Sequence, residues 1–312
     1  MMMDEYFSII INDSTQWLAI RGDKNKPVLL ILHGGPGTPS MNLFRKWNKP
    51  LEKDFLVVTW DQRGTGRSNS KDLDRDSLTI NQLVEDTCSL TIYLKDQYKK
   101  DKIYLMGHSF GTTLALKTII RYPDDYAAYF GISQFVNASK NESSCYDWLL
   151  HEAEARNDKK GLKMLLSVGR PVDGFYKSGL KGTVKVKQLV GKYKGDSLGK
   201  SSTFAVLLNL LICKEYRGKN LGRALTGINL SLSTIGYDLK GIDFPMEIKK
   251  FSMPLFFFSG RHDRLTPQHL LWEYYEKITA PEKRLFIFEE SAHSPLWEES
   301  DKFHQIIHEL MV

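Results

Sequence analysis

A serine between two glycines is the first candidate for chemistry in this sequence. Gly107-His-Ser-Phe-Gly111 has the pattern G-x-S-x-G; the apolar run 103–106 precedes it and a helical pattern over 112–121 follows it. In a sharp turn from a strand to a helix, glycines are needed on both sides of the serine because larger side chains would clash. We predict that this turn presents Ser109 as a nucleophile, beside a helix N-terminus that favours developing negative charge.

A serine hydroxyl becomes a good nucleophile only when a base takes its proton, and the base needs an acid to orient it. Asp263 follows the apolar run 255–259, and His293 follows the run 284–288. Both lie just beyond the carboxyl end of a predicted buried strand, where open α/β sheets place their functional residues. The chain order Ser, Asp, His is typical of this kind of serine turn. The sequence therefore predicts Ser109, Asp263 and His293 as a catalytic triad for acyl transfer.

A glycine-rich loop, His33-Gly-Gly-Pro-Gly37, follows the apolar run 27–32. Glycines in such a loop let backbone N–H groups point into a site. Serine hydrolases with this turn bind the oxyanion through one N–H of this loop and one N–H of the residue after the nucleophile. We therefore predict Gly35 and Phe110 as the oxyanion-hole donors; the alternative for the loop is a plain strand-ending turn.

The segment Asp61-Gln-Arg-Gly-Thr-Gly-Arg-Ser68 ends another apolar run and carries three charged side chains. Asp61, Arg63 and Arg67 could help to shape the mouth of a site. Because aspartate and arginine in loops commonly hold turns together, we predict a structural role for these three residues.

The elements that position these residues can be predicted from the apolar pattern. Residues 6–11 and 16–21 flank a polar turn and are typical of a β-hairpin. Continuous apolar runs, which indicate strands buried on both faces of a parallel sheet, lie at 27–32, 55–60, 103–106, 126–132, 255–259 and 284–288. Helical patterns at 81–97, 112–121 and 269–279 separate several of these runs. This alternation predicts an α/β protein with a mostly parallel, doubly wound sheet.

The strand-like runs stop between residues 137 and 248, where helical patterns replace them. Helices are predicted at 146–155, 161–166, 184–193, 204–216 and 221–235. We therefore expect a sheet-forming core of residues 1–136 and 249–312, with a helical insertion, residues 137–248, between two of its strands.

Composition limits the class of protein. Of the 312 residues, 42% are apolar and 26% are charged, as in globular proteins and unlike disordered or fibrous ones. The longest apolar stretch, 204–213, contains Asn209 and is too short to cross a bilayer, so no membrane insertion is expected. Because Asp4 and Glu5 occupy the region where a signal peptide carries positive charge, no secretion signal is expected. Because the three cysteines are scattered, we expect a reducing, cytoplasmic setting and no thiolate metal site.

Positive charge is concentrated in the insertion. The whole chain has a net charge of +6, but residues 156–223 contain 16 basic and 4 acidic side chains, a net +12. Such a segment could bind nucleic acid, an anionic membrane or an acidic substrate. No nucleic-acid recognition motif accompanies the charge. We therefore predict a solvated, lysine-rich face and no nucleic-acid partner.

Five motifs together resemble a known family. They are His33-Gly-Gly-Pro-Gly37, Asp61-Gln-Arg-Gly-Thr-Gly-Arg-Ser68, Gly107-His-Ser-Phe-Gly111, Gly260-Arg-His-Asp263 and Ala292-His-Ser294. The sequence resembles the α/β-hydrolase superfamily and, more narrowly, the prolyl aminopeptidase (proline iminopeptidase) family of serine peptidases. The resemblance implies an α/β-hydrolase fold, the triad and the oxyanion donors described above, and a helical cap over the site formed by residues 137–248.

The sequence departs from that family where the substrate would bind. The resemblance implies cap carboxylates, one of them in a Trp-Glu pair, that hold the free amine of the substrate, but Trp148 is followed by Leu149. A buried ammonium needs a paired anion, and Glu142 and Glu215 are the acids that we predict for this role. The positive charge of the insertion would oppose a cationic substrate. Phe110 also stands where the family often has tryptophan.

These observations predict a serine hydrolase that works through an acyl-enzyme, with no cofactor and no metal. The first hypothesis is an aminopeptidase on short peptides, similar to proline iminopeptidases. The second is a carboxylesterase or amidase on small acyl substrates, and the third is a non-catalytic ligand-binding protein on the same fold. An aminopeptidase requires an anion near Ser109, whereas an esterase requires only an apolar pocket. The sequence does not specify the oligomeric state.

Overall fold

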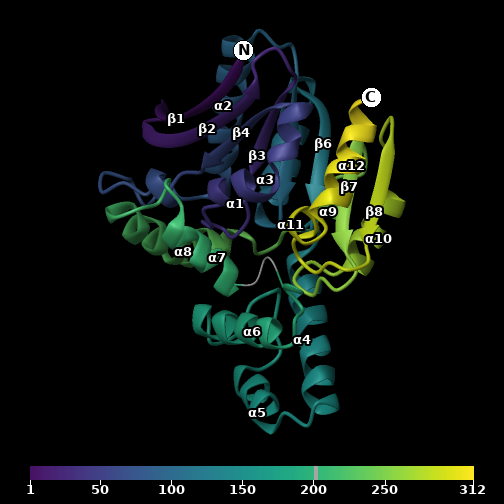
Figure 1. The fold of residues 1–312 in the computed structure, drawn as a ribbon. Coiled ribbons are helices and arrows are strands. Elements are labelled where there is room, and N and C mark those ends of the chain that lie inside the picture. The colour runs from purple at the N-terminus through teal and green to yellow at the C-terminus, as the bar shows by residue number, and fades with distance from the viewer. Residues whose placement is uncertain (200–202) are drawn as a thin grey trace.

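One mixed sheet forms the centre of the protein (Figure 1). The computed structural model describes residues 1–199 and 203–312. The strands follow the order β1-β2-β4-β3-β5-β6-β7-β8 across the sheet. Their bounds are β1 Met2–Ile11, β2 Ser14–Asp23, β3 Val28–Leu32, β4 Leu56–Asp61, β5 Ile103–His108, β6 Tyr126–Ile132, β7 Leu255–Gly260 and β8 Lys283–Phe288. This arrangement confirms the predicted α/β class with a mostly parallel sheet.

The strand directions divide the sheet into two parts. β1 and β2 form the predicted antiparallel hairpin, in which Ile11 pairs with Ser14. Its two-residue turn uses Asn12 and Asp13 at φ 44° and 62°, a left-handed conformation that these short polar residues tolerate. β2 also pairs antiparallel with β4, whereas the neighbours from β4 to β8 all pair in parallel. The continuous apolar runs of the sequence are therefore central, parallel strands.

Helices cover both faces of the sheet and explain why these strands are apolar throughout. In β3, Val28, Leu30 and Leu32 pack into one hydrophobic core, and Leu29 and Ile31 pack into the other. The first core is closed by α2 (Ile80–Tyr98), α3 (Phe110–Arg121) and α10 (Gln268–Lys277). The second is closed by α1 (Met41–Trp47), α11 (Pro295–Glu298) and α12 (Ser300–Met311). The sheet is therefore doubly wound, as predicted.

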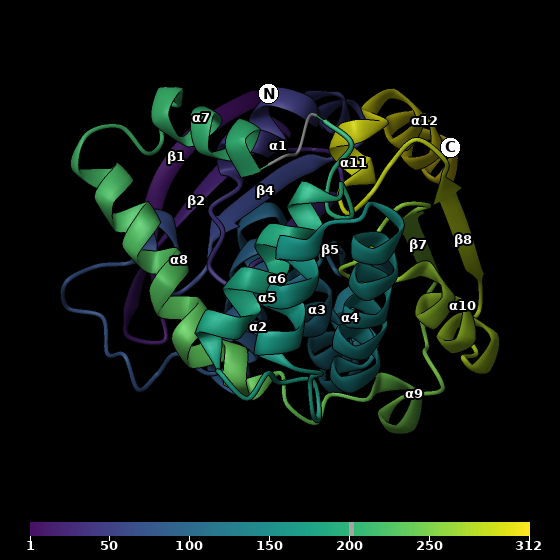
Figure 2. The same ribbon diagram turned by 90° about the horizontal axis from the view of Figure 1, so that it is seen from below.

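The segment between β6 and β7 is helical, as predicted, and it has two parts. Its helices are α4 (Ala138–Ala155), α5 (Lys159–Val168), α6 (Leu180–Lys192), α7 (Thr203–Ile212), α8 (Lys219–Asp238) and α9 (Phe244–Glu247). The helices α4, α5 and α6 project from the sheet as a lobe with its own apolar cluster (Figure 1). Helices α7 and α8 lie beside the core, α7 against α1 and α8 against the short helix Gly66–Ser68 (Figure 2).

Polar contacts attach the α7–α8 part to the core. The Tyr216 hydroxyl donates to Asp61 Oδ1 at 2.6 Å, and the Arg45 guanidinium lies 3.2 Å from Glu215. At the far end of α8, Asp238 accepts a hydrogen bond of 3.0 Å from the backbone N–H of Ile80, at the start of α2. The α7–α8 part is thus bound to the core along its length.

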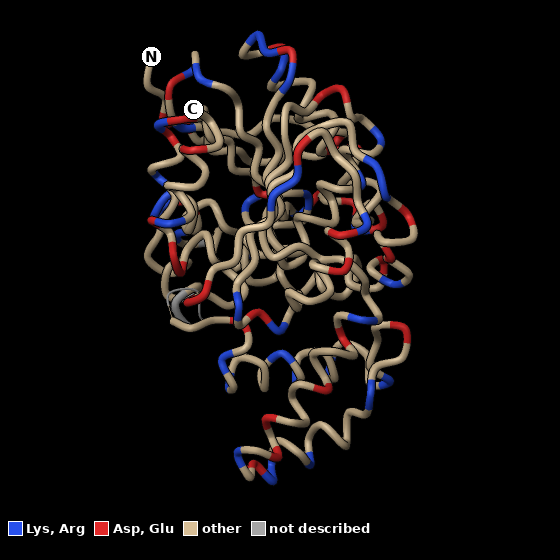
Figure 3. The backbone as a smooth tube through the Cα atoms, turned by 90° about the vertical axis from the view of Figure 1, so that its right-hand side faces the viewer, with Lys and Arg blue, Asp and Glu red and all other residues tan. Residues whose placement is uncertain are grey.

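Basic residues of the lobe are interspersed with acidic ones. Figure 3 shows Lys and Arg at several places along its backbone, with Asp and Glu between them. Several are paired within the lobe, including Lys192 with Asp158, Arg170 with Asp147 and Arg156 with Glu152. Neighbouring opposite charges partly cancel, so the positive field of the lobe is weaker than the number of its basic residues alone indicates.

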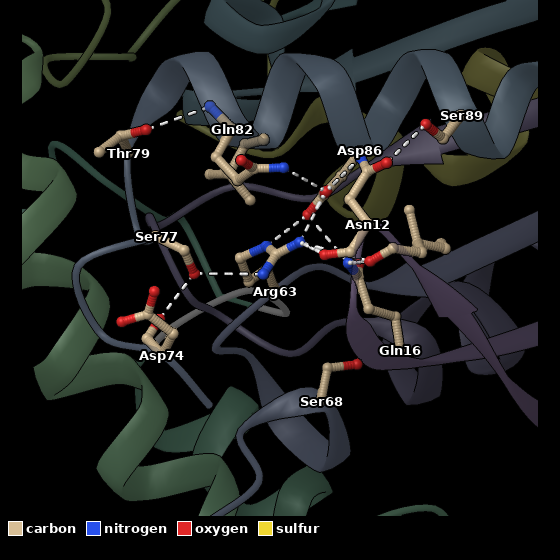
Figure 4. Close-up of polar contacts among 12 residues, drawn as sticks. Asn12, Gln16, Arg63, Ser68, Asp74, Ser77, Thr79, Gln82, Asp86 and Ser89 are labelled. Atoms are coloured by element: carbon tan, nitrogen blue, oxygen red, sulfur yellow. Dashed lines mark hydrogen bonds and ion pairs between the residues drawn. The ribbon is translucent and has the colours of Figure 1, made fainter. Parts of the chain in front are cut away.

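A buried ion pair joins the hairpin, the loop after β4 and α2 (Figure 4). Arg63 donates to both oxygens of Asp86, at 2.7 and 2.9 Å, and to the backbone carbonyl of Asn12 at 2.9 Å. The side chain of Asp86 is fully buried and also accepts from Gln16 and Gln82, at 2.9 and 3.0 Å. Arg63 therefore has the structural contacts that its place in a loop predicts.

We expect Arg63→Met to lower the free energy of unfolding by about 3–5 kcal/mol, because it leaves the Asp86 carboxylate buried without its cation. Urea denaturation followed by circular dichroism measures this change. The matched control is Arg121→Met, which breaks the exposed pair with Glu85 on the same helix α2 and should cost less than about 1 kcal/mol. Equal effects of the two substitutions would contradict the prediction.

A second prediction concerns Asp61, which is completely buried at the end of β4. Burial raises the pKa of Asp61 to about 7, against the hydrogen bonds from the Tyr216 hydroxyl and the Arg67 backbone. The folded protein therefore holds this proton more tightly than the unfolded chain, so its contribution to stability is lost as the pH rises from about 4 to 7. The free energy of unfolding of wild type minus that of Asp61→Asn should fall over this range, by at most about 1.4 kcal/mol per pH unit. A constant difference would contradict the pKa shift.

Candidate active site

The predicted serine turn lies between β5 and α3. Ser109 has φ 54° and ψ −121°, a strained conformation for a residue with a side chain. A Cβ at Gly107 would lie 2.7 Å from the carbonyl oxygen of Gly111, and a Cβ at Gly111 would lie 2.1 Å from that of Leu32. Both glycines are therefore required by space, for the reason that the sequence pattern indicated.

The structure brings together the three residues predicted as the triad. Ser109 Oγ lies 2.7 Å from His293 Nε2, and His293 Nδ1 lies 2.8 Å from Asp263 Oδ2. Ser109 directly follows β5, Asp263 lies in the loop after β7, and His293 lies in the loop after β8. With this geometry the imidazole can accept the serine proton while the carboxylate orients the ring.

Asp263 is held as an anion. Burial alone raises its pKa, but the charge of His293 and the hydrogen bonds from His293 and Thr266 bring the pKa below its ordinary value. Its Oδ1 accepts from the backbone N–H groups of Leu265 and Thr266, at 2.8 and 2.9 Å. An ionised carboxylate can only accept, so the proton between the two residues sits on Nδ1 of His293. Nε2 is then free to accept from the Ser109 hydroxyl.

Three further residues position the site; the sequence indicated a loop hydrogen-bonding role for His108 but did not indicate Thr266 or Ser133. Thr266 donates its hydroxyl to Asp263 Oδ2 at 2.6 Å. The backbone carbonyl of His293 accepts from Ser133 at 2.8 Å and lies 3.0 Å from Nε2 of His108. Burial, together with the charge of His293, lowers the pKa of His108 to about 3, so this ring is neutral and holds the loop. Thr266 lies three residues after Asp263 and Ser133 directly follows β6, so only their places near strand ends could have pointed to them.

A pocket of about 190 Å³ opens at Ser109. Gly35, Phe110 and His293 line it from the core side. Gly35 has φ 122°, and a Cβ there would lie 2.7 Å from the backbone nitrogens of Gly37 and Thr38. The residues predicted as oxyanion donors therefore lie in the same pocket as the predicted nucleophile.

Both parts of the insertion complete the pocket. The residues that line it from α4, α6, α8 and the loops beside them are Ala138, Glu142, Gly174, Phe175, Gly179, Leu180, Thr183, Lys187, Leu232, Gly236, Tyr237 and Leu239. The rings of Phe175 and Tyr237 stack, with centroids 5.9 Å apart, and so join the lobe to α8 beside the pocket. The wall is mainly apolar.

The structure separates the two acids predicted to bind an amine. Glu142 lines the pocket, where it lies 2.9 Å from Lys187. Glu215 does not line it: this residue is buried between α7 and α8, where the guanidinium of Arg45 on α1 neutralises it. The expectation that Glu215 faces the substrate is therefore corrected, because the loop that carries it packs on the core outside the pocket.

Residues 1–199 and 203–312 form neither a metal site nor a membrane-spanning helix. No group of three or more His, Cys, Asp and Glu side chains in these ranges is arranged to hold a metal ion. None of the helices they form has the length and apolar character needed to cross a bilayer. The three cysteines, Cys88, Cys145 and Cys213, are free.

Comparison with known proteins places the chain in a family. Residues 27–156 match the family model for the alpha/beta hydrolase fold. Over 294 residues the chain is 35% identical to a probable aminopeptidase, YbaC, of Bacillus subtilis. The aligned residues make up 94% of this chain and 92% of that relative. The chain therefore belongs to the α/β hydrolases.

Its relatives include proline iminopeptidases, as the motifs indicated. The chain is 26% identical over 282 residues to the proline iminopeptidase of Heyndrickxia coagulans, covering 89% of this chain and 88% of that one. A crystal structure of a proline iminopeptidase-related protein from Thermus thermophilus superimposes with a TM-score of 0.64 at 20% identity, over 98% of this chain and 96% of the other. That structural likeness supports the fold.

We expect Thr266→Val to slow the reaction of Ser109 with a fluorophosphonate about tenfold, because Asp263 loses a hydrogen bond to its charged form. Mass spectrometry of the labelled serine measures the rate. Thr183→Val is the matched control, since Thr183 lines the same pocket but does not contact the triad. An unchanged rate in Thr266→Val would show that the backbone N–H groups suffice to hold Asp263.

Proposed function

We propose that the protein is a serine hydrolase that acts through an acyl-enzyme. The observation that carries this proposal is the continuous line of hydrogen bonds from Ser109 through His293 to the buried Asp263. Ser109 Oγ attacks a carbonyl carbon while His293 Nε2 takes its proton, and Asp263 stabilises the imidazolium that forms. If Ser109 had only a structural role, it would not need a strained backbone conformation in the lining of a pocket.

The remaining steps follow from the same groups. The backbone N–H groups of Gly35 and Phe110 hold the oxyanion of the tetrahedral intermediate. His293 then gives its proton to the leaving group, and the acyl group stays on Ser109. Water gives a proton to the same imidazole as it attacks the ester carbon, and the imidazole returns that proton to Ser109 Oγ as the bond to the acyl group breaks and the acid leaves. These steps need no cofactor.

For the substrate we propose first an amino-terminal residue of a short peptide, which makes the protein an aminopeptidase similar to proline iminopeptidases. The relatives carry those names. The pocket of about 190 Å³ is smaller than the usual site for a drug-sized ligand, so it suits one small acyl group. Residues 137–248 act in this proposal as a cap on the core formed by 1–136 and 249–312, because both parts of the insertion line the pocket.

A carboxylesterase or amidase acting on small acyl groups is the second candidate, and one observation favours it. Glu142 is the only carboxylate among the described residues that line the pocket, and both of its oxygens already have partners in Lys187 and Tyr176. A free substrate amine would need one of those oxygens. An esterase needs only the apolar wall.

The test is a comparison of three substrate classes, with Ser109→Ala as the control. They are the 4-nitroanilides of proline, alanine and leucine, the N-acetylated forms of these anilides, and 4-nitrophenyl esters of short acids. Free-amine anilides as the best substrates would assign an aminopeptidase, and in either case Ser109→Ala should lower kcat by about 10⁶-fold. Turnover of the esters alone would assign a carboxylesterase. Turnover that persists in Ser109→Ala would refute the nucleophile, and with it the serine mechanism.

A further inference from the structure

A charged pair lies in the wall of the pocket, and the mechanism above does not use it. Lys187 on α6 places its ammonium 2.9 Å from Glu142 Oε1 on α4. The Tyr176 hydroxyl donates to the other oxygen, Oε2, at 3.1 Å. Glu142 and Lys187 both line the pocket that opens at Ser109. The two charges therefore face a substrate bound there.

Of the two charged groups, the lysine is the more accessible. The side chain of Lys187 is 35% exposed, whereas that of Glu142 is 18% exposed. An ammonium has three N–H donors, and Glu142 accepts one of them, so two remain for a ligand. Each oxygen of Glu142, by contrast, is already held by a donor. The pair therefore offers hydrogen-bond donors to the pocket.

The lysine keeps its charge in this position. Burial acts to lower the pKa of Lys187, but the attraction of Glu142 outweighs it and leaves the pKa above its ordinary value. Lys187 is also the only Lys or Arg among the described residues that line the pocket. An ammonium group on a substrate would have to share Glu142 with this cation, and like charges placed together oppose binding.

We propose that Lys187 is a specificity-determining residue. Its ammonium pairs with Glu142 and so disfavours a substrate ammonium at that carboxylate. Its remaining N–H groups donate to an oxygen acceptor, such as a carboxylate, on the acyl part of the substrate. This inference rests on the proposed serine hydrolase, names its substrate class and, of the two candidates above, favours the carboxylesterase or amidase. Glu142 and Tyr176 are positioning residues in this arrangement, since they hold the lysine chain toward the pocket. Aminopeptidase activity would then be the weaker activity of the wild-type site and would rise when the lysine is removed.

The test uses three fluorophosphonates with alkyl chains of equal length that end in a methyl, a carboxylate or an ammonium group. Ser109 Oγ forms a bond to phosphorus and fluoride leaves, so the rate of labelling measures selectivity without a known substrate. We expect the wild type to react at least about tenfold faster with the carboxylate probe than with the ammonium probe.

Lys187→Met should reverse this preference, because the methionine chain keeps the apolar length of lysine but frees Glu142 for the ammonium probe. Glu142→Gln should strengthen the preference for the carboxylate probe, since the lysine charge then has no anion beside it. Lys185→Met is the matched control: Lys185 is an exposed residue on the same helix and should leave the ratio unchanged. In Lys185→Met the rate with the methyl probe should also change less than about threefold. In every variant the carboxylate and ammonium rates are divided by the methyl rate, so that a general loss of reactivity is not taken for a change of preference.

A ratio of carboxylate to ammonium labelling that is the same in wild type and Lys187→Met, while the methyl probe still labels Ser109, would overturn this inference and leave the serine hydrolase standing. Failure of every probe to label Ser109 in the wild type would instead overturn the proposed function, and this inference with it.

Discussion

Parallel pairing of β5, β6 and β7 brings separate chain segments to one edge of the sheet. Gly107 pairs with Gly131, and Ile132 pairs with Phe258, so these strands end at a common level. The serine turn follows β5 without a linker, and the loops after β7 and β8 return to the same edge. Ser109 and His293 are 184 positions apart in the chain, and His293 and Asp263 are 30 positions apart, yet each pair comes within hydrogen-bond distance. The register of buried strands sets the geometry of the site.

Much of this fold could be predicted because a strand buried on both faces has no polar positions. The six apolar runs and the hairpin correspond to β1–β8, with small shifts at their ends. Local signals were weaker in the insertion. Helix α4 begins at Ala138, eight residues before the predicted start. The side chain of Asn137 caps this helix by accepting a hydrogen bond from the backbone N–H of Lys140. The turns of α4 that follow are polar, so hydrophobic periodicity could not show them. The short helices α1 and α11 span about two turns and one turn, too little chain for a reliable periodic signal.

The candidate site divides in the same way. The residues proposed as nucleophile, acid and base each lie in the turn or loop that follows a predicted strand, so chain order and motif were enough. The pocket wall comes from helices of the insertion, and hydropathy does not tell which acid of a helix or loop turns toward the core. Glu142 and Glu215 were equal candidates for that reason, and Lys187 was one of many basic residues. Only the packing of the insertion distinguishes them, because it places Glu142 and Lys187 in the pocket wall and holds Glu215 against Arg45.

Close packing between Gly111 and Leu32 has a consequence for how the site responds to ligands. The two backbones approach so tightly that not even one methyl group fits between them. The start of α3 and the glycine loop that follows β3 must therefore shift as one body. The two N–H groups that we propose for the oxyanion belong to these two segments, so their spacing is inherited from the sheet. The proposed anion site is therefore preorganised: its geometry forms when the chain folds, so binding an oxyanion requires little further rearrangement.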